Sequence, residues 1–70
     1  MYKIKREIYF NKYVGFYFAY AVIYKDTNGK ILKISDVFRS KKKAVEFIRI
    51  CNLLSLDPIH LEDVLEDYLQ

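Results

Sequence analysis

The sequence predicts an α+β protein in which a three-stranded antiparallel β-meander is followed by two helices packed on one face (βββαα). Apolar and polar residues alternate in the first part of the chain, a strong turn signal divides the strand-like segments, and residues 41–70 change to helical spacing. Seventy residues leave room for one hydrophobic core. We therefore expect a single domain over residues 1–70.

Two strand-like segments open the chain. Residues 2–10 have a period of two, typical of a half-buried strand. One side carries Tyr2, Ile4, Arg6, Ile8 and Phe10, and the other carries Lys3, Lys5, Glu7 and Tyr9. Asn11 and Lys12 mark the first turn, and residues 13–25, rich in aromatic and β-branched side chains, form the second strand.

The tetrapeptide Asp26-Thr27-Asn28-Gly29 predicts a second hairpin. Asp suits the first position of a type I turn, and Gly29 can adopt the positive φ that a three-residue loop with a bulge needs. The resulting register pairs Tyr24 with Leu32, Val22 with Ile34 and Phe18 with Phe38. A two-residue Asn-Gly loop would instead shift the third strand by one residue and mix bulky and small side chains on both faces.

The preferred register separates the two faces of the sheet. The bulky face carries Phe16, Phe18, Tyr20, Val22 and Tyr24, and the opposite face carries Tyr17, Ala19, Ala21 and Ile23 beside Lys33 and Ser35. Two short helices can cover only one face, and we expect them on the bulky one. The opposite face is then predicted to be open and apolar.

The helices follow from caps and apolar stripes. Ser40 caps a helix that runs to about Leu54, and Asp57 followed by Pro58 starts the second helix. The first stripe is Ala44, Phe47, Ile48, Cys51 and Leu54, and the second is Leu61, Val64, Leu65, Tyr68 and Leu69.

Charge is distributed unevenly along the chain. Residues 1–50 contain all 12 Lys and Arg against four acids, a net charge of +8, whereas residues 51–70 contain five acids and no Lys or Arg, a net −5. The basic half could attract a polyanion, or the two halves could attract each other within the fold. We favour attraction between the two halves within the fold.

The compartment is expected to be the cytoplasm. Cys51 is the only cysteine, and it stands in an apolar run, which indicates a reducing compartment. The N-terminus lacks the apolar core of a signal peptide, and the uncharged run of residues 13–24 is too short to span a bilayer. One Cys and one His cannot form a closed zinc site, so we predict no metal and no cofactor.

Two surfaces are candidates for binding. For the open sheet face, the predicted protein-binding residues are Tyr9, Tyr17, Ile23 and Lys33, since tyrosine is enriched in protein interfaces. For a nucleic-acid site, the candidates are Lys3, Lys5, Arg39, Lys41, Lys42 and Lys43. The three lysines at the helix start oppose the helix dipole, which would suit an anion site, but we favour their interpretation as a solvated run that keeps the protein in solution.

No catalytic residue is predicted. His60 lies between Asp57 and Asp63, and we expect it to form a structural hydrogen bond at the helix start. Cys51 falls on the buried stripe and is expected to be a small core residue. Glycine-rich phosphate loops and nucleophile motifs are not found, and no small-molecule substrate is evident.

The segment from Cys51 to Leu69 resembles the ending of a family of small uncharacterised Gram-positive bacterial proteins, a domain of unknown function. The matching pattern is Pro-x-His-Leu-x-Asp-Val-x-x-Asp-aromatic-Leu, present from Pro58 to Leu69. Gly15-Phe16 and Ile34-Ser35-Asp36 are weaker matches, and the short first loop at Asn11-Lys12 departs from the family. The resemblance implies this order of strands and helices and a bacterial cytoplasmic origin, and no known function.

The sequence therefore favours a non-catalytic protein-interaction or regulatory module. Its partner would be another protein, or a second copy, bound through the open sheet face. The alternative is a protein that binds nucleic acid, or an inhibitor of nucleic-acid machinery encoded by a phage or mobile element, acting through the basic half. Neither interpretation involves a membrane.

Overall fold

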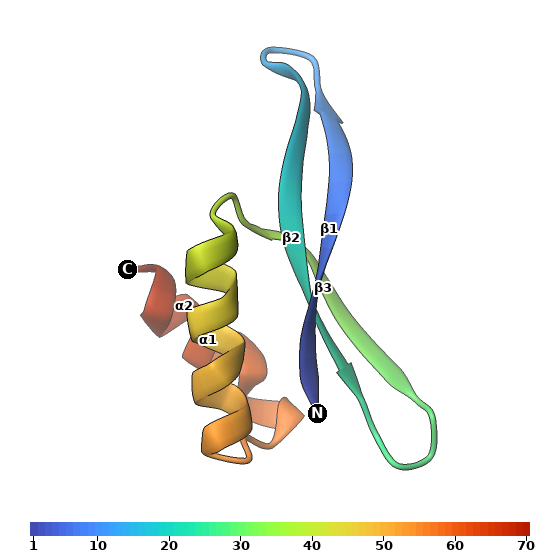
Figure 1. The fold of residues 1–70 in the computed structure, drawn as a ribbon, viewed down its shortest axis with the longest axis vertical. Coiled ribbons are helices and arrows are strands. Elements are labelled where there is room, and N and C mark those ends of the chain that lie inside the picture. The colour runs from blue at the N-terminus through green and yellow to red at the C-terminus, as the bar shows by residue number, and fades with distance from the viewer.

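The structure is a computed structural model that describes all residues from 1 to 70, and it confirms the predicted βββαα order (Figure 1). The strands are β1 (Tyr2–Asn11), β2 (Gly15–Lys25) and β3 (Ile31–Phe38). The helices are α1 (Lys41–Leu53), one 3₁₀ turn η1 (Pro58–His60) and α2 (Leu61–Leu69). The sheet order is β1-β2-β3, so β2 is central and the other two strands are edges.

The first hairpin turns later than predicted. β1 and β2 pair without interruption from Tyr2 opposite Tyr24 to Asn11 opposite Gly15, and residues 12–14 form the turn. Gly15 has φ +81°, a conformation that suits glycine, and the Asn11 side chain accepts a hydrogen bond from the Tyr13 N–H (2.8 Å). The second strand therefore begins at Gly15 and not at Tyr13.

The second hairpin has the predicted loop. Gly29 has φ +83°, and the Asp26 N–H donates to the Lys30 carbonyl (3.0 Å). The Asp26 carboxylate also accepts from the N–H groups of Asn28 and Lys30, which holds the loop. The pairs Tyr24–Leu32 and Val22–Ile34 are confirmed.

One predicted pair is wrong. Phe38 lies opposite Tyr20 and not opposite Phe18, because β3 contains a bulge between the pairs Val22–Ile34 and Tyr20–Phe38. Asp36, within this bulge, has φ +56°, a conformation that aspartate tolerates better than most residues. Because of the bulge, β3 pairs with β2 only as far as Tyr20, whereas the loop alone would predict pairing as far as Phe18.

Both helix starts are capped as expected. The Ser40 hydroxyl accepts from the Lys43 N–H (3.3 Å), and the Asp57 carboxylate accepts from the Ile59 N–H (3.0 Å). Asp57 caps the 3₁₀ turn η1, and α2 follows it directly. Leu54 lies beyond the end of α1 and is exposed, so its predicted place on the buried stripe is wrong.

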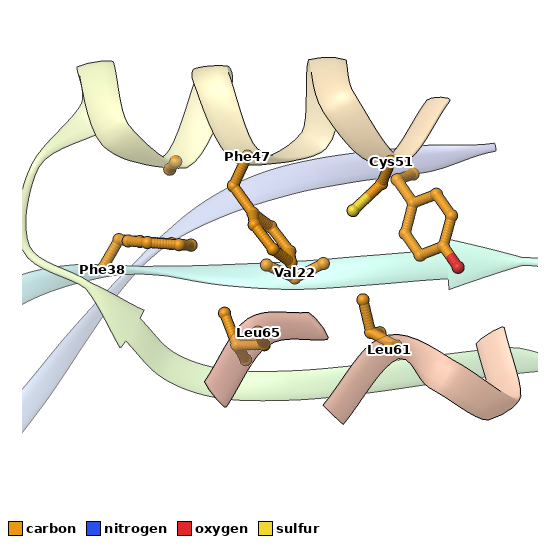
Figure 2. Packing of buried hydrophobic residues seen from close by; sticks show 8 residues of the cluster. Val22, Phe38, Phe47, Cys51, Leu61 and Leu65 are labelled. Carbon is orange, nitrogen blue, oxygen red and sulfur yellow. The ribbon is translucent and has the colours of Figure 1, made fainter. Parts of the chain in front are cut away.

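The core lies between the two helices and one face of the sheet. Figure 2 shows Phe47 and Cys51 of α1 and Leu61 and Leu65 of α2 directed toward Val22 of β2. The buried cluster consists of Tyr2, Val22, Phe38, Ala44, Phe47, Cys51, Leu61 and Leu65. Val22 belongs to the predicted bulky face, and Tyr2 and Phe38 pair with Tyr24 and Tyr20 of the same face, which confirms that the helices cover it.

The helices do not cover the whole length of the sheet. In Figure 1 the distal half of the β1–β2 hairpin extends past both helices and past the end of β3. The molecule is accordingly elongated, with principal extents of 37 × 27 × 18 Å. Neither helix has the length and apolar character that crossing a membrane requires.

Candidate protein-binding surfaces

The predicted open face carries a network of polar and aromatic side chains. The Glu7 carboxylate accepts hydrogen bonds from the Tyr9 hydroxyl (2.6 Å) and from the Lys33 ammonium group. The contact with Lys33 crosses from the first strand to the third, over the central strand. We call Glu7, Tyr9, Tyr17, Lys33, Asp36 and Arg39 the open-face network.

The β3 bulge completes this network. The Asp36 N–H donates to the Tyr9 hydroxyl (3.1 Å), and the Asp36 carboxylate accepts from the Tyr17 hydroxyl (2.7 Å). The rings of Tyr9 and Tyr17 stack with centroids 5.8 Å apart, and the Arg39 guanidinium lies 3.9 Å from the centroid of Tyr17. These contacts explain how a non-glycine residue is held at a positive φ in the bulge.

The hydrogen bonds also change acid–base properties. The bond from Lys33, and then the bond from Tyr9, lowers the pKa of the Glu7 carboxyl below its ordinary value of 4.5. The same contact with Glu7 raises the pKa of Lys33. The bond to Asp36 raises the pKa of Tyr17. Each shift favours the protonation state present in the network near neutral pH.

The expectation of an exposed apolar patch on this face is wrong for two of its four members. Ala19 and Ala21 are 0% exposed, although no helix lies on their side of the sheet. Ala19 is paired with Glu7 in the ladder and follows Tyr17 on the same face, so residues of the network surround it. The chain thus covers the centre of this face with its own side chains. A binding role for Tyr9, Tyr17, Ile23 and Lys33 stays a prediction.

The larger apolar surface lies on the opposite face, at the distal half of the β1–β2 hairpin. Two cross-strand pairs form it, Ile8 with Phe18 and Phe10 with Phe16. Their exposed fractions are 60% for Ile8, 64% for Phe10, 73% for Phe16 and 55% for Phe18. The Phe10 and Phe16 rings meet edge to face with centroids 5.1 Å apart. We call these four residues the hairpin patch.

The sequence signal for this patch is the difference in length between the helix and the strand, which alternation within a strand does not show. A helix rises about 1.5 Å per residue, so the 13 residues of α1 span roughly 20 Å. A strand rises about 3.3 Å per residue, so the 11 residues of β2 span roughly 35 Å. A helix of this length leaves the far end of a long hairpin uncovered. The members of the patch lie on the predicted bulky face, but beyond the part of that face that the helices cover.

The outer backbone edge of β1 is open as well. The Tyr2 N–H and C=O point away from β2 and bond to the side-chain amide of Asn52 (2.7 and 3.0 Å). Because bonding direction alternates along a strand, the N–H and C=O groups of Ile4, Arg6, Ile8 and Phe10 point the same way. No neighbouring strand pairs with them, since β1 is an edge. Asn52 thus covers only the start of this edge.

The predicted nucleic-acid residues do not form one surface. Lys3 and Lys5 lie on the sheet face opposite the helices, while residues 41–43 begin α1 in the helix layer. Arg39 packs on Tyr17 in the open-face network. No ion pair joins the acids of residues 51–70 to the basic half, so the attraction expected between the halves has no direct contact.

His60 and Cys51 are the remaining residues with potentially reactive side chains. The His60 side chain is exposed and makes no hydrogen bond, so its predicted bond at the helix start is wrong; Asp57 supplies the cap there instead. Cys51 is buried, and burial raises the pKa of its thiol. No group of three His, Cys, Asp or Glu side chains is placed to hold a metal ion.

No family model, curated protein or solved structure matches this chain. The resemblance of residues 58–69 to the Gram-positive family therefore stays a prediction.

Proposed function

We propose that the protein is a non-catalytic protein-interaction module of the bacterial cytoplasm and that its binding surface is the hairpin patch. The observation that supports this proposal is the exposure of four large apolar side chains in one contiguous group (Ile8, Phe10, Phe16 and Phe18). A monomeric protein seldom leaves such a group in water. Aromatic side chains are also the residues that protein interfaces favour.

The hairpin patch supports the proposal better than the open face does. Members of the open-face network already bond to one another and cover the alanines beneath them. The hairpin patch has a single charged contact, the Arg6 guanidinium 4.8 Å from the centroid of Phe18. A partner that covers this patch displaces water from apolar groups without breaking hydrogen bonds within the chain.

The test is affinity capture from lysate, with and without nuclease treatment, comparing three forms of the chain. Wild type is expected to retain partner proteins that the double variant Phe10→Thr with Phe16→Thr loses. Threonine keeps the β propensity of these exposed positions, so the double variant should retain the wild-type circular dichroism. The control is Ile23→Thr on the open face, which is expected to retain the same proteins.

Two outcomes would contradict the proposal. Equal capture by wild type and the hairpin variant, with loss in Ile23→Thr, would move the interface to the open face. Binding that disappears with nuclease and weakens steeply with salt would support the basic residues as a nucleic-acid site.

A further inference from the structure

We infer that a second copy of this chain occupies the hairpin, with the β1 strands of the two copies pairing edge to edge in antiparallel orientation. The inference rests on the proposed function and specifies the partner. Its product is a two-fold symmetric dimer with a continuous six-stranded sheet.

The outer edge of β1 is unpaired over most of its length. Its outward N–H and C=O groups are covered at Tyr2 by Asn52, and no other element pairs with them up to the turn. Edge strands in natural proteins are usually short, bulged or covered, because an open edge invites another strand. β1 is 10 residues long, and its pairing with β2 contains no bulge.

The side-chain pattern along this edge favours antiparallel pairing centred on Ile8. When two β1 strands pair about an axis at Ile8, Ile8 faces its own copy and Arg6 faces Phe10 of the other chain. On the other side of the sheet, Glu7 faces Tyr9. About six backbone hydrogen bonds then form, two for each of the pairs 6–10, 8–8 and 10–6. Arg6 already stacks on a phenylalanine within its own chain, which is the contact that Phe10 of the second copy would also offer.

Like charges disfavour the neighbouring registers. An axis at Arg6 sets Arg6 against itself, and an axis at Glu7 sets Glu7 against itself. An axis at Tyr9 sets Arg6 against Lys12. Directly opposed like charges destabilise a sheet. Among the registers centred on residues 6 to 9, the one at Ile8 alone avoids them.

A shallow groove on α1 lies beside the same edge. The groove, of about 480 Å³, is lined by Val45, Ile48, Arg49, Asn52 and Leu53. Asn52 is the residue that holds Tyr2, so this side of α1 borders the outer edge of β1. α1 and β1 run in opposite directions (Figure 1). The β1 strand of a second copy is antiparallel to the first β1, so it runs in the same direction as α1. The hairpin of the second copy therefore extends along α1 toward its C-terminal end, where Asn52 lies. Its tip, with the exposed Tyr13 and Val14, reaches the level of this groove.

Exposed apolar side chains line both parts of such an interface. Ile8 and Phe10 lie on β1 itself and are 60% and 64% exposed, whereas Phe16 and Phe18 lie on β2, one strand away from the pairing edge. The tip residues Tyr13 and Val14, 83% and 65% exposed, and Leu53 of the groove, 81% exposed, add to the apolar contact. Two-fold symmetry lets each of these surfaces contact the other copy.

The distal edge of β2 is a poorer candidate. Beyond Tyr20 this edge is also unpaired, because β3 ends opposite that residue. However, Arg39, in the connection from β3 to α1, packs on Tyr17 there. The free part of this edge is also shorter than that of β1.

Cysteine cross-linking tests the register. In the inferred dimer the two copies of residue 8 have Cα atoms about 5.5 Å apart, which suits a disulfide. Ile8→Cys, oxidised with glutathione disulfide, is expected to form a covalent dimer at least about tenfold faster than Phe18→Cys, the matched control on the β2 edge. Cys51 is buried in both variants and should not react. Equal rates, or faster linking through residue 18, would overturn the inference.

Sedimentation at increasing concentration tests the association itself. Wild type is expected to form a dimer, and Ile8→Pro is expected to weaken it at least about tenfold, because proline removes the outward N–H while leaving the bonds to β2 intact. Ile8→Thr keeps that N–H and serves as the control. Wild type that stays monomeric would overturn the inference; the proposed function would still stand if the hairpin variant lost a captured partner of another sequence.

Discussion

Tyr2 is the residue at which the first strand, the first helix and the loop before the second helix meet. Its hydroxyl donates to the Leu56 carbonyl (2.8 Å), its backbone bonds to Asn52, and its ring lies 4.8 Å from that of Tyr24. The residue is only 3% exposed. Burial, more than neighbouring charge, raises the pKa of Tyr2 from 10.0 to about 12.

This shift predicts a dependence of stability on pH. Because the folded-state pKa is raised, the contribution of the neutral phenol is fully present below pH 10 and is lost as pH rises through 10 toward 12. Tyr2→Phe is expected to lower the free energy of unfolding at pH 7 by about 1 kcal/mol through loss of the bond to Leu56. The deficit should shrink above pH 10, where wild type itself loses stability.

Urea unfolding of both proteins at pH values from 7 to 11 measures this difference. The comparison with Tyr2→Phe cancels the titration of the other tyrosines, which remain in both chains. A deficit that stays constant across the range would show that the phenol does not ionise with a raised pKa.

At the scale of elements, structure that depends on residues close together in the sequence was predicted best. Asp26 and Gly29 define the second hairpin through bonds within five residues, so the sequence could predict its loop and register. The bulge at Asp36 depends on hydroxyl groups from two other strands, Tyr9 and Tyr17. A contact of that kind arises only once the sheet has formed, and this is why the Phe18–Phe38 pair was predicted wrongly.

The second helix shows how far an apolar stripe predicts burial. Leu65 is 7% exposed in the core, whereas Leu69, one turn later on the same stripe, is 55% exposed. Leu65→Ala is expected to cost about 2–5 kcal/mol as a core truncation. Leu69→Ala, the matched control, should change the free energy of unfolding by no more than about 0.5 kcal/mol.

Thermal unfolding followed by circular dichroism compares the two leucine variants. Leu65→Ala is expected to melt far below wild type, or to be unfolded at room temperature, because a domain of this size is marginal. Similar melting of the two variants would mean that α2 does not belong to the cooperative core.

At the scale of the whole molecule, the lengths of the helices relative to the strands decide which part of the sheet is covered. Alternation correctly assigned Ile8, Phe10, Phe16 and Phe18 to the face that packs on the helices, but it contains no information on how far the helices reach. The sequence therefore overestimated how much of the open face is exposed: the small residues Ala19 and Ala21 indicated an open apolar surface, yet both are 0% exposed. Small residues in a strand are compatible with either arrangement.

The same difference in length predicts that stability is uneven across the molecule. Ile23 lies in the part of β2 that the core supports, while Tyr17 lies in the two-stranded part, and both residues pair with β1. An isolated two-stranded hairpin is marginal in water. In the monomer, the Tyr17 amide should therefore exchange its hydrogen through local opening, and the Ile23 amide through opening of the core.

Native-state hydrogen exchange by NMR, at a concentration where sedimentation shows monomer, measures both amides in one sample. We expect the Tyr17 amide to exchange at least about tenfold faster than the Ile23 amide, after correction for intrinsic rates, which corresponds to about 1.4 kcal/mol. At concentrations that favour the dimer the difference should narrow, because the second copy supports the distal hairpin. Equal protection of the two amides in the monomer would show that the open-face network alone stabilises the distal hairpin. The proposal of a partner would then rest on the exposed hairpin patch alone.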